Sequence, residues 1–301
     1  FFPNLFVVCW KYRGDSDVVR MINPAPAAIE ELTRMKLVGF NNRRYDNHIL
    51  YARIMGYGEK TLFELSQRIV ANDQSGMFGD AYNLSYADVW DFSSKKQSLK
   101  RFQIDLGLNH KELGLPWDSE VDPALWEEVA DYCANDVVTT EQVFEDRYQD
   151  YVARQILADL AGMSVNDTTQ RLTAKIIFGD DRHPSEKFKY TDLSRQFKGY
   201  EFNLGKSSYK GEDPGEGGYV YAEPGMYTNV AVLDVASMHP TSIVLLDLFG
   251  PYTARFAELK AARIDVKRRD YASARRRFDG APKAYLGSDD NAKALADALE
   301  I

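Results

Sequence analysis

The order of hydrophobic and polar positions in the first half of the chain predicts strands interleaved with helices. Short apolar runs indicate a strand at Leu5–Tyr12 and a buried strand at Leu37–Phe40, and Leu84–Phe92 is expected to be extended. Apolar residues at helical spacing predict five helices: Pro26–Met35, Asp46–Met55 closed by Gly56, Thr61–Ala71, Leu99–Leu106 before Gly107, and a long helix that starts at Asp122-Pro123. Such alternation predicts an α/β domain.

The second half of the chain has a different texture. Glycine and proline accumulate between Gly199 and Gly225, which predicts turns and a domain junction. After this segment, Val230–Val235 is typical of a continuous apolar strand, and Phe256–Phe278 of a basic helical stretch. We therefore expect one domain over residues 1–150, a connecting region over 151–215, and two further regions over 216–250 and 251–301.

Composition narrows the class of protein. The 301 residues suffice for two domains, and 45% hydrophobic with 27% charged residues excludes disordered and fibrous chains. No apolar run approaches the ~18 residues of a membrane span, and no signal peptide opens the chain. The two cysteines, Cys9 and Cys133, form neither a disulfide framework nor a zinc site. We expect a protein of the cytoplasm, without membrane partners.

The two ends of the sequence suggest a piece of a longer protein. The chain starts Phe-Phe-Pro without an initiator methionine and ends inside a helical pattern without a C-terminal cap.

Charge is unevenly distributed. Within a net charge of −8, residues 251–286 contain ten Lys and Arg against four Asp and Glu, a local +6. A basic helix is typical of a phosphate-contacting surface, and equally of a solvated helix face.

Three aspartates have neighbours that suggest chemistry. Asp234 closes the apolar Val230–Val235 pattern, where a carboxylate must be paired, bound to metal or placed at an exposed strand end. Asp46 follows a strand and opens a helix, and Asp136 lies one helical turn beyond Tyr132. The simpler interpretations are a capped turn at Asp234, a helix N-cap at Asp46 and an ordinary surface pair at Tyr132 and Asp136.

Carboxylates that the fold brings together, with a tyrosine beside them, suit two-metal hydrolysis of a phosphodiester. Hard oxygen ligands favour Mg²⁺ or Mn²⁺ over zinc. The four histidines have no metal-ligand spacing, and no Gly-x-Ser-x-Gly motif supports serine hydrolase chemistry.

Two segments resemble the second and third motifs of proofreading exonucleases. Asn42-Arg-Arg-Tyr45-Asp46 matches the pattern of Asn, spacer, aromatic residue and Asp, and Tyr132-Cys-Ala-Asn-Asp136 matches Tyr, three residues, Asp.

Three later segments follow the order of family B DNA polymerases. Gly217-Gly218 resembles the Gly-Gly loop between exonuclease and polymerase regions, and the segment from Asp234 to Ile243 resembles the first palm motif. Arg263 and Lys267 resemble the fingers helix that holds the incoming triphosphate. The resemblance spans nearly the whole chain and is closest to viral or phage replicases.

The sequence also departs from this family. The Asp-x-Glu of the first exonuclease motif is absent and would precede Phe1. The second palm aspartate is absent, Asp289-Asp290 lacks the strand context to replace it, and His239 stands where the family usually has a tyrosine under the sugar.

The resemblance implies a ribonuclease-H-like 3′–5′ exonuclease domain with a mixed sheet, followed by partial palm and fingers regions. It implies Mg²⁺ or Mn²⁺ as cofactor, and primer-template DNA, single-stranded DNA 3′ ends and deoxynucleoside triphosphates as partners. The implied residues fall into four groups: catalytic Asp46, Tyr132, Asp136 and Asp234; metal-binding Asp46, Asp136, Asp234 and Val235; nucleotide-binding Ser237, Met238, His239, Arg263 and Lys267; and DNA-binding Asn42, Tyr45, Lys100, Gly217 and Gly218.

Two alternatives remain open from the sequence. One is a stand-alone 3′–5′ exonuclease with a DNA-clamping C-terminal half. The other is a non-catalytic DNA-binding remnant of a polymerase.

Overall fold

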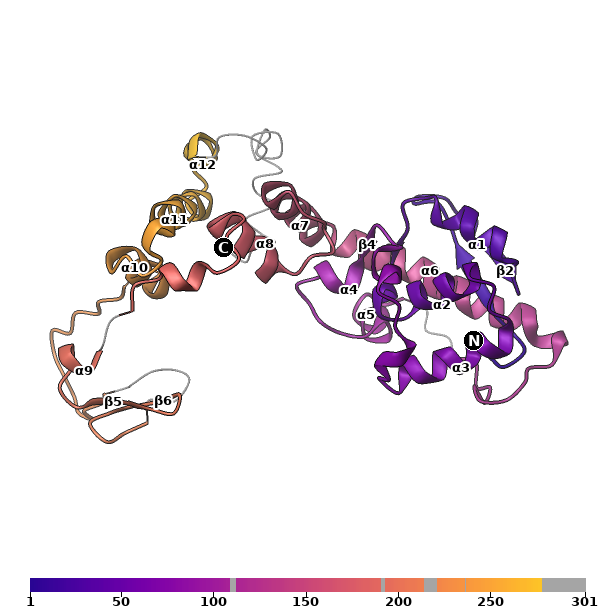
Figure 1. Cartoon of the computed structure of the whole chain (residues 1–301), viewed down its shortest axis with the longest axis horizontal. Coiled ribbons are helices and arrows are strands. Elements are labelled where there is room, and N and C mark those ends of the chain that lie inside the picture. The colour runs from indigo at the N-terminus through magenta and orange to yellow at the C-terminus, as the bar shows by residue number, and fades with distance from the viewer. Residues whose placement is uncertain (109–111, 191–192, 214–220, 236, 278–301) are drawn as a thin grey trace. The chain divides into compact units, whose positions relative to one another are not determined.

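The computed structural model describes residues 1–108, 112–190, 193–213, 221–235 and 237–277 (Figure 1). They belong to two compact units: Phe1–Ile176 together with the segment that begins at Arg263, and Ile177–Ala262. Helices predominate over small sheets, so the expected mixed α/β class is confirmed, while the ribonuclease-H-like arrangement stays a prediction. Among the helices described, none has both the length and the apolar character needed to cross a bilayer.

The first unit contains two short sheets of different type. An antiparallel pair is formed by β1 (Val7–Trp10) and β2 (Val19–Ile22), and a parallel pair by β3 (Val38–Gly39) and β4 (Ala87–Asp88). Because parallel strands need a crossover connection, the chain between β3 and β4 folds into helices.

Helices make up most of this unit. They are α1 (Pro26–Thr33), η1 (Asn42–Arg44), α2 (Asp46–Ile54), α3 (Glu59–Val70), η2 (Gln74–Gly76), η3 (Asp80–Asn83), α4 (Val89–Phe92), α5 (Leu99–Asp105), η4 (Pro123–Leu125), α6 (Trp126–Asp146), α7 (Tyr148–Ala161) and α8 (Thr169–Phe178), the last ending just inside the second unit. Of these, α1, α2, α3 and α5 lie close to predicted helices, as does the start of the long helix at η4 and α6. Asp122 caps η4, since its carboxylate accepts a hydrogen bond from the Ala124 amide at 2.9 Å.

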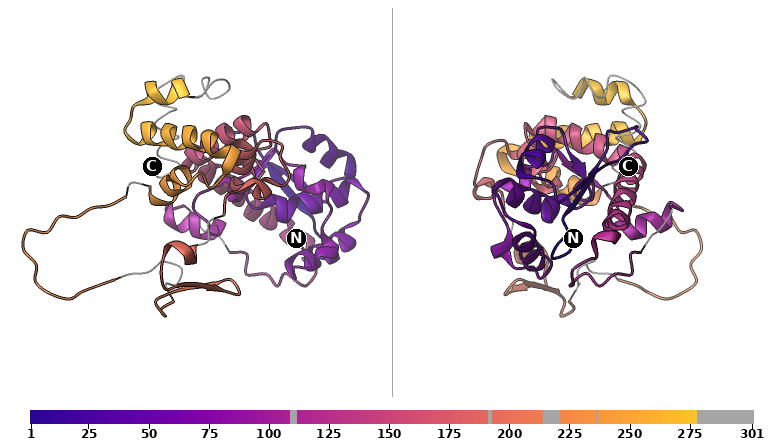
Figure 2. Two further views of the ribbon diagram at one scale, coloured as in Figure 1. Left: turned by 60° about the vertical axis from the view of Figure 1, so that its left-hand side comes forward. Right: turned by 90° about the vertical axis from the view of Figure 1, so that its right-hand side faces the viewer.

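Helix α6 lies along the β1–β2 hairpin (Figure 2). Arg20 on β2 pairs with Asp131 on α6 at 2.6 Å, and Lys11, just after β1, forms a largely buried ion pair with Glu141. These two ion pairs connect the hairpin to α6 at separate points along the helix.

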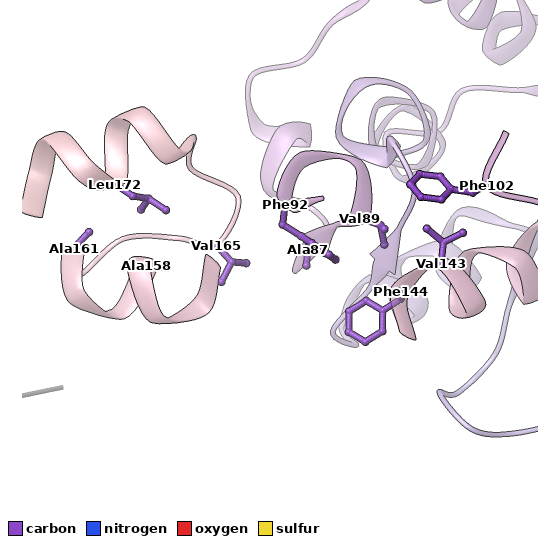
Figure 3. Packing of buried hydrophobic residues seen from close by; sticks show 10 residues of the cluster. All are labelled: Ala87, Val89, Phe92, Phe102, Val143, Phe144, Ala158, Ala161, Val165 and Leu172. Atoms are coloured by element: carbon purple, nitrogen blue, oxygen red, sulfur yellow. The ribbon is translucent and has the colours of Figure 1, made fainter. Parts of the chain in front are cut away.

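The main apolar cluster of the first unit has two groups of side chains (Figure 3). In one group, Phe102 of α5 lies beside Val143 of α6 and meets Phe40 edge to face at 6.0 Å. The other group joins α7 to α8 through Ala158, Ala161, Val165 and Leu172.

The second unit contains a hairpin and part of a helical region. Its elements are η5 (Pro184–Lys187), α9 (Leu193–Gln196), β5 (Tyr200–Asn203), β6 (Lys206–Tyr209), α10 (Met238–Leu245) and η6 (Gly250–Tyr252). Helix α11 (Thr253–Lys267) starts in this unit and is followed by α12 (Tyr271–Arg277). The two compact units divide the chain after Ile176 and after Ala262. The predicted boundaries after residues 150, 215 and 250 stay predictions.

Three local predictions differ from the structure. Leu84–Phe92 is extended only at β4 and then turns into α4, because Asp88 caps that helix by accepting from the Trp90 amide at 2.9 Å. Strand β2 has no counterpart among the predicted elements, and the β5–β6 hairpin lies inside the segment predicted as turns.

The predicted strand at Val230–Val235 is wrong. These residues have no strand conformation and are exposed, with Leu233 at 94% of its full accessibility. A strand is stabilised by hydrogen bonds to a neighbouring strand, and no described segment pairs with this one.

The core position of Phe102 gives a prediction about stability. Phe102 is 1% exposed, whereas Ile104 on the same helix is 62% exposed. Phe102→Ala should lower the free energy of unfolding by about 3–5 kcal/mol, because it leaves a cavity beside Phe40 and Val143. Ile104→Ala is the matched control and should change it by about 0.5 kcal/mol or less. Denaturant unfolding measures both, and equal losses would contradict this description of the core.

Candidate functional site

The buried carboxylate of Asp88 organises the ends of the parallel strands β3 and β4. It accepts hydrogen bonds from the amides of Asn41 at 2.8 Å, Arg43 at 3.0 Å and Trp90 at 2.9 Å. Burial raises the pKa of Asp88, and these hydrogen bonds oppose that shift. One side chain thus fixes both the turn after β3 and the start of α4.

The turn after β3 carries the motif predicted to bind DNA. Asn41 adopts a left-handed conformation (φ 57°), and Asn42 is buried against Gly39. A Cβ on Gly39 would lie 2.8 Å from the Asn42 side chain, so glycine is required for this packing. The Asn42 Oδ1 is buried and has no hydrogen-bond partner within the described part of the chain.

Tyr45 has a structural contact that the sequence did not predict. Its hydroxyl lies 2.6 Å from the Ser66 hydroxyl on α3, its ring packs against the apolar cluster around Leu62, and burial raises its pKa. Its side chain also contributes to the wall of a cleft.

Asp46 is the first residue of α2 and lines the same cleft. Solvent reaches the residue, yet enough protein surrounds its carboxyl group that desolvation raises its pKa to about 6. The charges of Asp88 and Asp136 contribute to this rise, whereas its own backbone amide and the α-amino group of Phe1 oppose it.

Asp136 and Tyr132 lie one turn apart on α6, both partly buried. Burial raises the pKa of Tyr132, and the charge of Asp136 adds to that rise. Lys100 on α5 is near enough to act electrostatically on both, but its ammonium is hydrogen-bonded to Glu112 at 2.6 Å, which raises its pKa. The fold thus brings Asp46, Tyr132, Asp136 and Lys100 into one electrostatic neighbourhood.

The cleft beside Asp46 has a volume of about 650 Å³ and a mixed aromatic, cationic and polar wall. Trp90 is central to that wall: the Arg44 guanidinium and the Lys96 ammonium each lie 4.5 Å from its ring centroid. The lining residues are Phe40, Asn41, Arg44, Tyr45, Asp46, Trp90, Lys96, Gln97, Ser98 and Leu99.

Positive charge remains on this wall after its ion pairs are formed. Arg43 and Arg44 both pair with Asp91, each at 2.7 Å, so two cations share one carboxylate. The Lys96 ammonium donates to the Asp91 carbonyl at 3.0 Å, and burial lowers its pKa. This wall can attract an anion such as a phosphate.

Two of the residues predicted for polymerisation lie at the surface. Asp234 and Val235 are exposed on an irregular segment, so the strand expected to end at Asp234 is absent there. Ser237 precedes α10 in a left-handed conformation, and Met238 and His239 begin that helix with exposed side chains.

The remaining predicted residues lie on α11 or outside the described residues. Arg263 is an exposed residue of α11, one turn before Lys267, whose side chain is not described. Gly217 and Gly218 lie outside the described residues. Their predicted roles stay predictions.

Two carboxylates of this neighbourhood are of the chemical type that magnesium prefers. Asp46 and Asp136 supply two hard oxygen donors, and their mutual repulsion is of the kind that a divalent cation relieves. Across the described residues, no three His, Cys, Asp or Glu side chains converge as a complete set of metal ligands.

Sequence reasoning missed Asp88, Trp90, Arg44 and Lys96. The adjacent arginines inside the Asn42–Asp46 motif were the available signal. The contact of Arg44 with Trp90 depends on the pairing of β3 with β4, which sequence patterns did not reveal.

The raised pKa of Asp46 predicts a pH-dependent stability. Protonation favours the folded state, because the pKa rises from an ordinary 3.8 to about 6 on folding; this contribution is complete below about pH 4 and is lost as pH rises through 6. In EDTA, Asp46→Asn should raise the melting temperature at pH 8 by a few degrees. The corresponding gain in the free energy of unfolding is at most about 1 kcal/mol, because the residue is partly solvated. The gain should vanish by pH 4. Asp131→Asn, at an exposed ion pair on α6, is the control and should give no gain. A less stable Asp46→Asn variant at pH 8 would contradict the assignment.

Comparison of the chain with models of protein families, with curated proteins and with solved structures gave no match.

Proposed function

We propose that residues 1–176 carry a metal-dependent 3′–5′ exonuclease that acts on single-stranded DNA, as the proofreading part of a family B DNA polymerase. The observation that supports this most is Asp46: it lines an open cleft with a cationic wall and lies close enough to Asp136 for their charges to interact. Single-strand binding sites commonly combine positive charge with aromatic side chains, and this wall has both.

In this proposal different side chains bind the substrate, orient the water and hold the metal ion. Arg44 and Lys96 bind backbone phosphates of the substrate strand, while the Tyr132 hydroxyl orients the attacking water. Asp46 and Asp136 would hold Mg²⁺ or Mn²⁺, which when bound supplies charge neutralisation and an activated water.

The family resemblance implies an Asp-x-Glu pair in addition to Asp46 and Asp136. That pair would complete the carboxylate set that the described residues supply in part.

The polymerisation half of the hypothesis rests on the resemblance alone. Ser237, Met238 and His239 at α10, with Arg263 and Lys267 on α11, are proposed to contact the deoxynucleoside triphosphate. Asp234, with Val235, is proposed to bind the polymerisation metals only once a palm sheet forms around it.

Digestion of DNA tests the carboxylates. With a 5′-labelled single strand and Mg²⁺ or Mn²⁺, the protein should shorten the strand from its 3′ end, and EDTA should stop the reaction. Asp46→Ala and Asp136→Ala should each lower the rate at least about 100-fold, because each removes a proposed metal ligand. Tyr132→Phe should lower it about 10–100-fold, since it affects only the water.

The matched control is Asp146→Ala, which removes a carboxylate at the far end of α6 and should leave the rate unchanged. Equal digestion by the wild type and both aspartate variants would contradict the site. DNA binding without digestion would favour the non-catalytic alternative.

Binding of DNA tests the cationic wall separately. In fluorescence anisotropy with a labelled single strand in EDTA, the Arg44→Ala, Lys96→Ala double variant should raise Kd about 10-fold. The slope of its log Kd against the logarithm of the salt concentration should fall by about 1.4 if two phosphate contacts are lost. Lys60→Ala, at an exposed lysine of α3, is the control. An unchanged salt dependence in the double variant would show that this wall does not contact DNA.

A further inference from the structure

The two cysteines of the chain meet in the folded protein. Cys9 lies on β1 and Cys133 on α6, both are free thiols of intermediate burial, and the two side chains are hydrogen-bonded to each other. The Cys9 Sγ also donates to the carbonyl oxygen of Ala130 at 3.6 Å, one helical turn before Cys133. The contact with Ala130 therefore places the Cys9 sulfur against this turn of α6.

The surrounding structure holds the two thiols in place. Cys9 is in register with Arg20 on β2, and Arg20 pairs with Asp131 on α6 at 2.6 Å. Beyond the cysteines, the ion pair of Lys11 with Glu141 connects the end of β1 to the same helix. Because ion pairs lie on both sides of the thiols, the hairpin cannot move far from α6 without breaking them.

The hydrogen bond makes the two thiols unequal. It lowers the pKa of Cys133, although burial opposes this, and it raises the pKa of Cys9. The thiolate is the reactive form of cysteine, so Cys133 is the expected nucleophile and Cys9 its partner.

We propose that Cys9 and Cys133 form an oxidisable pair, which hydrogen peroxide converts into an intramolecular disulfide between β1 and α6. The Cys133 thiolate attacks one peroxide oxygen, the O–O bond breaks, and a sulfenic acid forms with release of one water after proton transfer. The Cys9 sulfur then attacks the Cys133 sulfur, forming the S–S bond and releasing the second water. Two thiols are oxidised by two electrons and one peroxide is reduced to two waters.

The proposed disulfide would join β1 to the helix that carries Tyr132 and Asp136. It does not rest on the proposed exonuclease, because its chemistry needs only the two thiols and peroxide. Its effect on the fold can therefore be measured without a nuclease assay.

The experiment treats the folded, reduced protein with hydrogen peroxide and then blocks remaining thiols with iodoacetamide. We expect a monomer about 2 Da lighter that takes up no iodoacetamide, and a Cys9–Cys133 peptide in a non-reducing digest. Dithiothreitol should restore two alkylatable thiols. The oxidised protein should melt about 5 °C or more above the reduced protein, because the cross-link closes a long loop of the unfolded chain.

Two controls separate fold-directed oxidation from adventitious oxidation. Cys9→Ala and Cys133→Ala each keep one thiol and should show neither the 2 Da loss nor the peroxide-dependent rise in melting temperature. In guanidinium the wild type should form the intramolecular bond at least about 10-fold more slowly, since its ends must then meet by chain diffusion.

Three results would overturn the proposal. They are two thiols that remain alkylatable after peroxide treatment, a disulfide found only between molecules, and a rate in guanidinium equal to that of the folded protein.

Discussion

The candidate site depends on the buried Asp88 carboxylate, which accepts three hydrogen bonds from backbone amides. It fixes the turn that starts at Asn41 and also caps α4. Asp46 comes directly after this turn in the chain, and Trp90 lies in α4. One buried carboxylate therefore positions both the acidic and the cationic sides of the cleft. Hydrogen bonds to a charged acceptor are stronger than neutral ones, which compensates for part of the cost of burying this carboxylate.

The same region contains an electrostatic conflict. Asp46 is partly desolvated and lies within reach of the charges of Asp88 and Asp136, and all three effects disfavour its ionised form. A fold selected only for stability would place a neutral residue there, and perturbed carboxylates in clefts are common at functional sites. We therefore regard the conflict as support for a cation-dependent role, with the cationic wall of Arg44 and Lys96 as the complementary part of the site.

The second unit shows how a local pattern can mislead. Val230–Val235 has the apolar continuity of a buried strand, yet these residues are exposed and unpaired with any described strand. A continuous apolar run indicates that a segment can be buried as a strand. Whether it pairs with another strand depends on residues distant in the sequence. The role proposed for Asp234 depends on a sheet that the described residues do not supply.

The sequence by itself determined several of the helices. Leu62, Leu65 and Ile69 repeat at helical spacing on α3, and Asp122-Pro123 marks the start of a long helix, because periodicity and capping act over a few residues. The sequence also singled out Asp46 and Asp136, and the fold brings their charges within reach of each other. Only the tertiary structure decided the partners: Asp88 with the turn after β3, Trp90 with two cations, and Cys9 with Cys133. These contacts join positions far apart in the chain through the pairing of β3 with β4 and the packing of β1 on α6, which short-range patterns do not specify.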